Sequence, residues 1–98
     1  MHIAFRNKQI EKVCTNASVA RKKYGDRIAQ KIEQRLGEID AADTVEMMIE
    51  FRIGRCHALT GDRQGQYAVD LVHPQRLVFT REGDTIQVAM IEEIVDYH

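Results

Sequence analysis

The chain contains few aromatic residues and almost no cysteine or proline. Its 98 residues include no tryptophan, one proline and two cysteines, and aromatic side chains make up 6% of them. Cys14 and Cys56 are too few for a disulfide scaffold and lack the CxxC spacing of a metal-binding or redox motif. We therefore expect two buried or half-buried thiols that have no catalytic role.

Long apolar segments are also missing. No stretch is apolar enough to cross a bilayer, and the N-terminal MHIAFRNKQ lacks the apolar run and the small-residue cleavage site of a secretory signal. A composition that is 44% hydrophobic and 30% charged is typical of a folded globule rather than a disordered chain. We expect one cytoplasmic domain over residues 1–98, with a thin core and no contact with a membrane.

The net charge is −1, which argues against a general nucleic-acid binder, but the charge is unevenly distributed. Residues 1–40 hold nine Lys/Arg and five Asp/Glu, a balance of +4, whereas residues 41–98 hold five and ten, a balance of −5. Beyond Lys31 every cation is an arginine. Arginine can bind phosphate through two hydrogen bonds at once, although the five arginines of residues 41–98 can equally be ordinary surface residues.

The first 40 residues favour a strand followed by helices. HIAF (2–5) is typical of a short strand, and Asn7 suits the N-cap of a helix that runs through Cys14. Ser18 suits the N-cap of a longer helix to Ile39. Apolar residues recur along that helix at the helical period and predict a core-facing stripe: Tyr24, Ile28, Ile32, Leu36 and Ile39.

The second half changes to a period of two. Asp43 with Glu46 resembles a capping box before a short helical turn at 45–50. Alternating segments separated by turn formers then predict strands at 55–59, 66–72, 76–81 and 85–98. The fold class predicted is α+β, with an N-terminal strand and helices packed on one face of a mainly antiparallel sheet of about four to five strands.

Common catalytic motifs are absent. The chain has no GxGxxG, P-loop, HExxH or GxSxG segment. A zinc site from His57, His98, Asp96 and a cysteine is conceivable, but these residues lack metal-ligand spacing. We expect no metal and no cofactor.

Strand residues provide the remaining candidates. Asp96 and His98 share one face of an extended strand, and His57 with Arg76 could meet them on the sheet face that the helices leave open. Such a set suits metal-free RNA cleavage, in which a base takes the 2′-OH proton, an arginine stabilises the phosphorane and an acid protonates the leaving oxygen. The alternative is that these are ordinary surface side chains. Tyr97 points to the other face, into the core or toward a base.

The segment RCHALTGDRQGQYAVDLVHPQRLVF and the closing IVDYH resemble the HigB branch of the RelE superfamily, the toxins of type II toxin–antitoxin systems also called plasmid-maintenance killer proteins. The resemblance extends over the whole chain in length and element order. It implies a RelE-like fold and a ribosome-dependent endoribonuclease, or mRNA interferase, that cuts mRNA in the ribosomal A site and so inhibits translation.

The same resemblance implies roles for individual residues. His57, Asp96 and His98 would be the acid and base residues, Tyr97 would lie beside them, and Arg76 would stabilise the phosphate. The family often has a lysine where this chain has Thr60, so no basic contact is implied there. Tyr67 follows the GDRQG turn one residue later than in the family pattern.

The resemblance also implies partners. Basic side chains would contact the ribosome and A-site mRNA, and those singled out are Arg21, Lys22, Lys23, Arg27, Arg55 and Arg63. A cognate helix-turn-helix antitoxin, HigA-like, would neutralise the toxin, and operator DNA would be reached only through it. Two alternatives remain: a non-catalytic inhibitor on the same fold, like the ParE toxins that block gyrase, and a plain protein-interaction module.

Overall fold

A five-stranded mixed sheet forms the centre of the molecule. The computed structural model describes residues 1–96. The strands are arranged in the order β1-β5-β4-β3-β2, with β1 parallel to β5 and the other pairs antiparallel. Their bounds are β1 (His2–Phe5), β2 (His57–Ala58), β3 (Gln66–Asp70), β4 (Gln75–Glu82) and β5 (Val88–Asp96).

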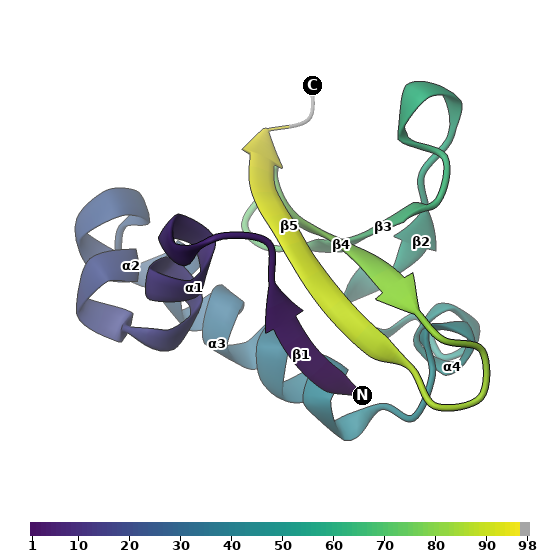
Figure 1. The fold of residues 1–98 in the computed structure, drawn as a ribbon. Coiled ribbons are helices and arrows are strands. Elements are labelled where there is room, and N and C mark those ends of the chain that lie inside the picture. The colour runs from purple at the N-terminus through teal and green to yellow at the C-terminus, as the bar shows by residue number, and fades with distance from the viewer. Residues whose placement is uncertain (97–98) are drawn as a thin grey trace.

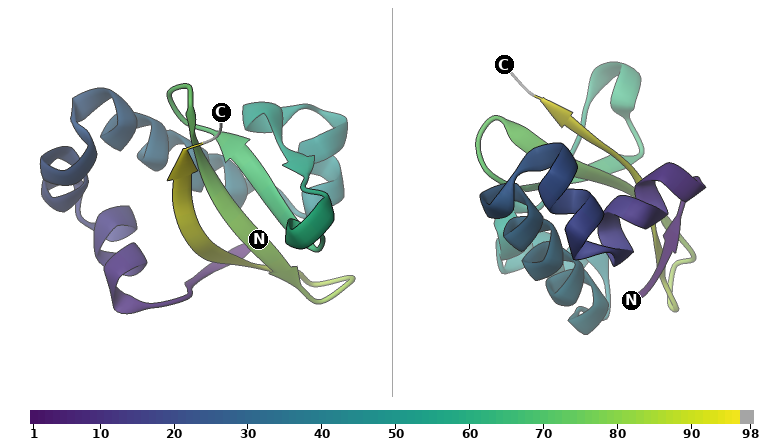
Figure 2. Two further views of the ribbon diagram at one scale, coloured as in Figure 1. Left: turned by 90° about the horizontal axis from the view of Figure 1, so that it is seen from above. Right: turned by 90° about the vertical axis from the view of Figure 1, so that its left-hand side faces the viewer.

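Four helices cover one face of this sheet (Figures 1 and 2). They are α1 (Lys8–Thr15), α2 (Ala17–Tyr24), α3 (Asp26–Ala41) and α4 (Val45–Glu50). The predicted apolar stripe faces the core, with Ile32 and Ile39 buried. Strand residues that meet the helices are equally buried: Val69, Leu77, Phe79, Ala89 and Ile91. The predicted α+β class and the placement of the helices are confirmed.

The long helix predicted from Ser18 to Ile39 is wrong, because Gly25 divides it. Gly25 has φ 89° and ψ 169°, a conformation that only glycine adopts readily, and it ends α2 and precedes α3. Asn16, not Ser18, caps α2: its side-chain oxygen accepts hydrogen bonds from the Ser18 and Val19 N–H groups. The N-cap predicted at Asn7 is confirmed by its bond to the Ile10 N–H.

Two further details differ from expectation. Thr44, not Asp43, caps α4, and its hydroxyl accepts from the Met47 N–H. The strand predicted at 55–59 shortens to β2, because residues Ile53–Arg55 form a 3-10 turn, η1, whose backbone cannot continue a ladder. The short β2 leaves room for the η1 turn beside the sheet.

A β-bulge interrupts the pairing of β4 with β5. Val78 lies opposite Glu93 while Phe79 lies opposite Ile91, so Glu92 is an extra residue in β5. One extra residue reverses the alternation of every side chain that follows it. Without the extra residue, the side chains of residues 93–96 would each point to the opposite face of the sheet.

The face away from the helices carries a second, smaller apolar cluster. Leu59, Ala68 and Val78 are buried there, and Val95 packs against them. Leu59 belongs to the loop between β2 and β3, which contains a second 3-10 turn, η2 (Gly61–Arg63). This loop projects from the sheet in Figure 1. Within residues 1–96, no helix combines the length and apolar character that a membrane crossing needs.

Candidate functional site

A hollow of about 650 Å³ lies where η1 and the end of α4 meet strands β2, β3 and β4. Its lining combines three arginines, one histidine and one aspartate with two apolar side chains. The residues are Ile49, Arg52, Arg55, Cys56, His57, Asp70 and Arg76. We call this surface the arginine hollow. Its formal charge is +2 with His57 neutral, so it favours an anionic ligand.

His57 is held by its backbone neighbour. Its Nδ1 lies 2.9 Å from the Arg55 carbonyl oxygen. A carbonyl can only accept, so Nδ1 carries the hydrogen and Nε2 of the neutral ring carries the lone pair. Nε2 faces Arg76 Nη1 at 3.4 Å. The arrangement is a histidine oriented as a proton acceptor beside a permanent cation.

Asp70 joins the two arginines on either side of this histidine. Its Oδ1 lies 3.4 Å from Arg76 Nε, and its Oδ2 lies 3.3 Å from Arg55 Nε. The pairing follows from strand register, because Asp70 lies directly opposite Arg76 and their side chains share one face. The Arg76 side chain is 28% exposed and that of Arg55 is 83% exposed. Arg76 is thus fixed in the wall, whereas Arg55 extends into solvent.

The η1 segment has an unusual backbone. Arg52 has φ 54° and Arg55 φ 56°, and Gly54 between them has φ 60°. The left-handed conformation costs a non-glycine residue about 1–3 kcal/mol and is concentrated at functional sites. A Cβ at Gly54 would come within 2.8 Å of the Arg35 side chain, so this turn needs glycine for space as well.

Arg35 links the hollow to the helical layer. Its Nε donates to the Asp70 carbonyl oxygen at 2.6 Å, and its Nη1 binds Glu38 Oε1 at 2.8 Å. The Arg35 side chain is only 12% exposed. The backbone that carries Asp70 is therefore braced by α3.

The expectation that Asp96 shares a face with His57 and Arg76 is wrong. Arg76 lies opposite Val95, so its side chain and that of Val95 share the open face. Asp96 lies opposite Gln75 and is directed to the other face. The cause is the extra residue Glu92, which reverses the alternation of β5. Tyr97 and His98, also predicted catalytic, lie outside the described residues.

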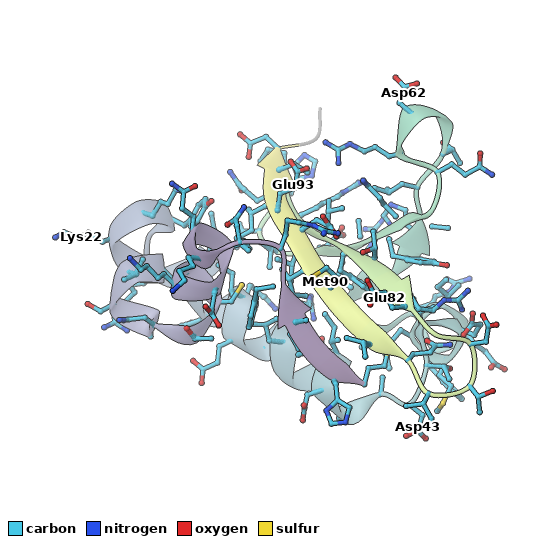
Figure 3. The ribbon with its side chains drawn as sticks, viewed as in Figure 1. Lys22, Asp43, Asp62, Glu82, Met90 and Glu93 are labelled. Atoms are coloured by element: carbon cyan, nitrogen blue, oxygen red, sulfur yellow. The ribbon has the colours of Figure 1, made fainter. Side chains whose placement is uncertain are left out.

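The predicted RNA-binding residues fall into separate groups. Arg55 lines the arginine hollow. Arg63, on the η2 turn, binds Gln66 at 2.9 Å and Glu93 at 3.5 Å instead. The remaining four are exposed on α2 and the start of α3: Arg21, Lys22, Lys23 and Arg27. They lie at the opposite end of the molecule from β2, as the position of Lys22 in Figure 3 shows. Among the candidates within residues 1–96, the structure therefore brings together His57, Arg76 and Arg55.

Sequence reasoning missed two charged residues of the hollow, Asp70 and Arg52. Asp70 is an acidic residue at the end of the apolar strand β3. Its pairing with Arg76 could have been predicted only if the register between β3 and β4 were known. Arg52 had no visible signal, because its place in the hollow depends on the left-handed backbone of η1.

The cysteine in the wall is not a nucleophile. Burial raises the pKa of the Cys56 thiol to about 12, and that of Cys14 to about 12 as well. Both are free thiols, Cys56 buried and Cys14 half-buried, as predicted. Among residues 1–96, no group of three or more His, Cys, Asp or Glu side chains has a geometry that could hold a metal ion.

This sheet order, with the helices on one face, is similar to the fold of solved YoeB structures. Among solved structures, a YoeB/ParE toxin from Agrobacterium tumefaciens superposes with a TM-score of 0.67 at 13% identity, covering 100% of both chains. A YoeB–YefM complex from Staphylococcus aureus and a YoeB dimer from the same organism each give 0.63 at 23% identity, covering 100% of this chain and 97% of theirs. The predicted RelE-like fold is confirmed.

Sequence comparison adds nothing to this assignment. No protein-family model matches the chain, and no curated protein does. The relation thus rests on the shape of the backbone, and the HigB branch remains a prediction.

Proposed function

We propose that the protein is the toxin of a type II toxin–antitoxin system and acts as a ribosome-dependent mRNA endonuclease. The observation that carries the proposal is the His57–Arg76 pair inside an arginine-lined hollow, on a RelE-superfamily toxin fold. A fold of this kind without a proton acceptor would suit the gyrase-inhibiting alternative equally well. A histidine oriented by a backbone carbonyl beside a fixed arginine favours chemistry on a phosphodiester.

The proposed reaction needs no metal. His57 Nε2 removes the proton of a ribose 2′-OH, and the 2′-oxygen attacks the adjacent phosphorus. Arg76 stabilises the charge that develops on the phosphorane oxygens, which a guanidinium can bind through two hydrogen bonds. The bond to the 5′-oxygen breaks and that oxygen takes a proton from an acid. The products are a 2′,3′-cyclic phosphate and a 5′-hydroxyl end.

The acid is proposed from the family resemblance. The closing Asp96, Tyr97 and His98 match the Asp-Tyr-His end of the HigB branch, and His98 is the proposed proton donor. The Asp96 side chain is directed away from Arg76. Asp96 would therefore act through neighbouring side chains and would not contact the reacting phosphate itself.

The proposed partners are the ribosome with A-site mRNA and a helix-turn-helix antitoxin of the HigA type. The exposed cations of α2 and α3 would contact ribosomal RNA by charge. The Staphylococcus aureus YoeB fold was solved as a complex with YefM, so a fold of this shape does occur with a partner protein. Operator DNA would be bound by the antitoxin.

Induced expression in a bacterial host tests this proposal. Wild type is compared with His57→Ala, Arg76→Ala, His98→Ala and a deletion of 96–98, with His2→Ala, an exposed histidine in β1, as the matched control. We expect wild type and His2→Ala to arrest growth and cut translated mRNA. Loss of the proton acceptor should reduce cleavage by about 10²–10⁴-fold.

Two outcomes contradict the proposal. Equal mRNA cleavage by wild type and His57→Ala would remove the assigned base. Growth arrest with intact mRNA in all strains would instead support inhibition of the gyrase type.

A further inference from the structure

The arginine hollow holds more cationic groups than one phosphate needs. Arg76 lies beside His57, but Arg55 of η1 and Arg52, which directly precedes η1, line the same hollow. We propose that Arg52 and Arg55 form a second phosphate subsite, so that the hollow binds two consecutive phosphates of single-stranded RNA. The inference rests on the proposed function, because it takes RNA to be the ligand.

Asp70 sets the spacing of the two subsites. One of its carboxylate oxygens binds Arg76 and the other binds Arg55, so two guanidinium groups are held side by side in the absence of a ligand. The carboxylate is a resident counter-ion that keeps them from separating by repulsion. A phosphodiester chain offers one negative charge per nucleotide, and adjacent cations match adjacent charges.

The two arginines on Asp70 differ in how readily they can change partner. The Arg76 side chain is 28% exposed, and His57 also contacts it. The Arg55 side chain is 83% exposed, and an ion pair at that exposure is weak and easily exchanged. Arg55 can therefore leave Asp70 for a phosphate while Arg76 stays in place beside the reacting bond.

The backbone of η1 supports a binding role for its arginines. Arg52 and Arg55 are both in the left-handed conformation, which asparagine or glycine would adopt more easily. Both are exposed and neither belongs to the hydrophobic core. The turn therefore holds two strained residues whose side chains contribute positive charge to the hollow rather than packing to the core.

RNA is favoured over an acidic peptide by position. The second subsite shares its hollow with His57 Nε2, the atom proposed to take the 2′-OH proton. An RNA phosphate bound by Arg52 and Arg55 would hold the chain on one side of the scissile bond, while Arg76 holds the reacting phosphate. Holding the substrate in this way aids catalysis by orienting the reacting atoms. An acidic peptide would gain nothing from the histidine.

Binding of 2′-deoxy oligonucleotides tests the subsite without turnover, because they lack the attacking hydroxyl. A dinucleotide with one phosphodiester and a trinucleotide with two are titrated against the full chain by calorimetry at low salt. Wild type should bind the trinucleotide about tenfold more tightly, the gain expected for one additional charged hydrogen-bonding contact. Its affinity should also fall more steeply with salt, by about 0.7 in log–log slope.

Three variants locate that gain. The double variant Arg52→Gln/Arg55→Gln should bind the trinucleotide no more tightly than the dinucleotide. Arg76→Gln should weaken both ligands. Arg81→Gln, an arginine in β4 that pairs with Glu46, is the matched control and should keep the tenfold gain. Thermal melting of each variant shows that it is folded.

The proposal is overturned if the double variant keeps the trinucleotide gain, or if wild type shows none. It is also overturned if a polyglutamate peptide, but not the trinucleotide, depends on Arg52 and Arg55, since the surface would then serve a protein. These outcomes are distinct from failure of the proposed function. A chain that cuts mRNA but shows no gain lacks only the subsite, and one that shows the gain without cutting mRNA binds RNA for another purpose.

Discussion

At the scale of single residues, Asp70 is the least expected part of the site. It binds Arg55 and Arg76 through separate oxygens, and Arg35 holds its carbonyl. Its carboxylate also repels any phosphate that enters the hollow. Positioning and repulsion therefore oppose each other at this residue.

Asp70→Asn separates those two effects. The amide removes one negative charge, so the KM for programmed ribosomes should not rise. Arg76 loses its charged anchor, and misplacement of such a group lowers kcat by about tenfold to a hundredfold. Single-turnover cleavage assays give both values. A rise in KM with unchanged kcat would mean that Asp70 contacts the ligand instead.

The left-handed backbone at Arg52 gives a second prediction at this scale. Arg52→Gly and Arg52→Ala both delete the side chain, but only glycine adopts φ 54° without strain. We expect the glycine variant to be more stable than the alanine variant by about 1 kcal/mol. Urea denaturation measures the difference. Equal stabilities would show that the turn is not strained.

At the scale of elements, Gly25 and Gly37 have opposite roles. Gly25 joins α2 to α3 at φ 89°, whereas Gly37 lies inside α3 with open space around its Cβ position. Gly25→Ala should destabilise the fold by about 1–3 kcal/mol, and Gly37→Ala should stabilise it by about 0.5–1 kcal/mol. Thermal melting of the two variants checks both signs. Stabilisation by Gly25→Ala would mean that the helices merge.

The bulge in β5 forms an ion pair with Arg6, the residue that directly follows β1. Glu92, the extra residue, accepts from Arg6 at 2.9 and 2.7 Å and from Thr80 at 2.8 Å. The Arg6 hydrogen bonds are the main cause of a Glu92 pKa below its ordinary value, opposed by burial. Because folding favours the ionised carboxylate, this stabilisation is present above the unfolded pKa, near 4.3, and is lost as the pH falls through the lowered folded value.

Glu92→Gln tests that dependence. At pH 7 the variant should be less stable than wild type by about 1 kcal/mol. The difference should shrink as the pH is lowered below about 4. Denaturation curves at several pH values measure it. A difference that stays constant down to pH 3 would contradict the assignment.

At the scale of the whole molecule, much of the architecture could be predicted from periodicity. The change from a period of about four to a period of two located the helices and strands, and the apolar stripe through Ile32 and Ile39 faces the core. The break at Gly25 was missed because a glycine inside a helix and a glycine that ends a helix look the same in a sequence. The short β2 was missed because η1 depends on three left-handed residues.

The candidate site was harder to predict, because it depends on register between strands. His57 and Arg76 were expected on the same face, and His57 Nε2 lies 3.4 Å from Arg76 Nη1. Asp96 was expected with them, but one bulge residue reversed its direction. Alternation within a strand is visible in a sequence, whereas an extra residue opposite a partner strand is not.

The proposed function requires that the arginine hollow cuts mRNA in the ribosomal A site. The most direct measurement uses the purified chain, ribosomes programmed with a defined A-site codon, and primer extension to map any cut. We expect wild type to cut within that codon and to leave a 5′-hydroxyl on the downstream fragment, and His57→Ala to leave the mRNA uncut. Intact mRNA with wild type, or an equal cut with His57→Ala, would contradict it.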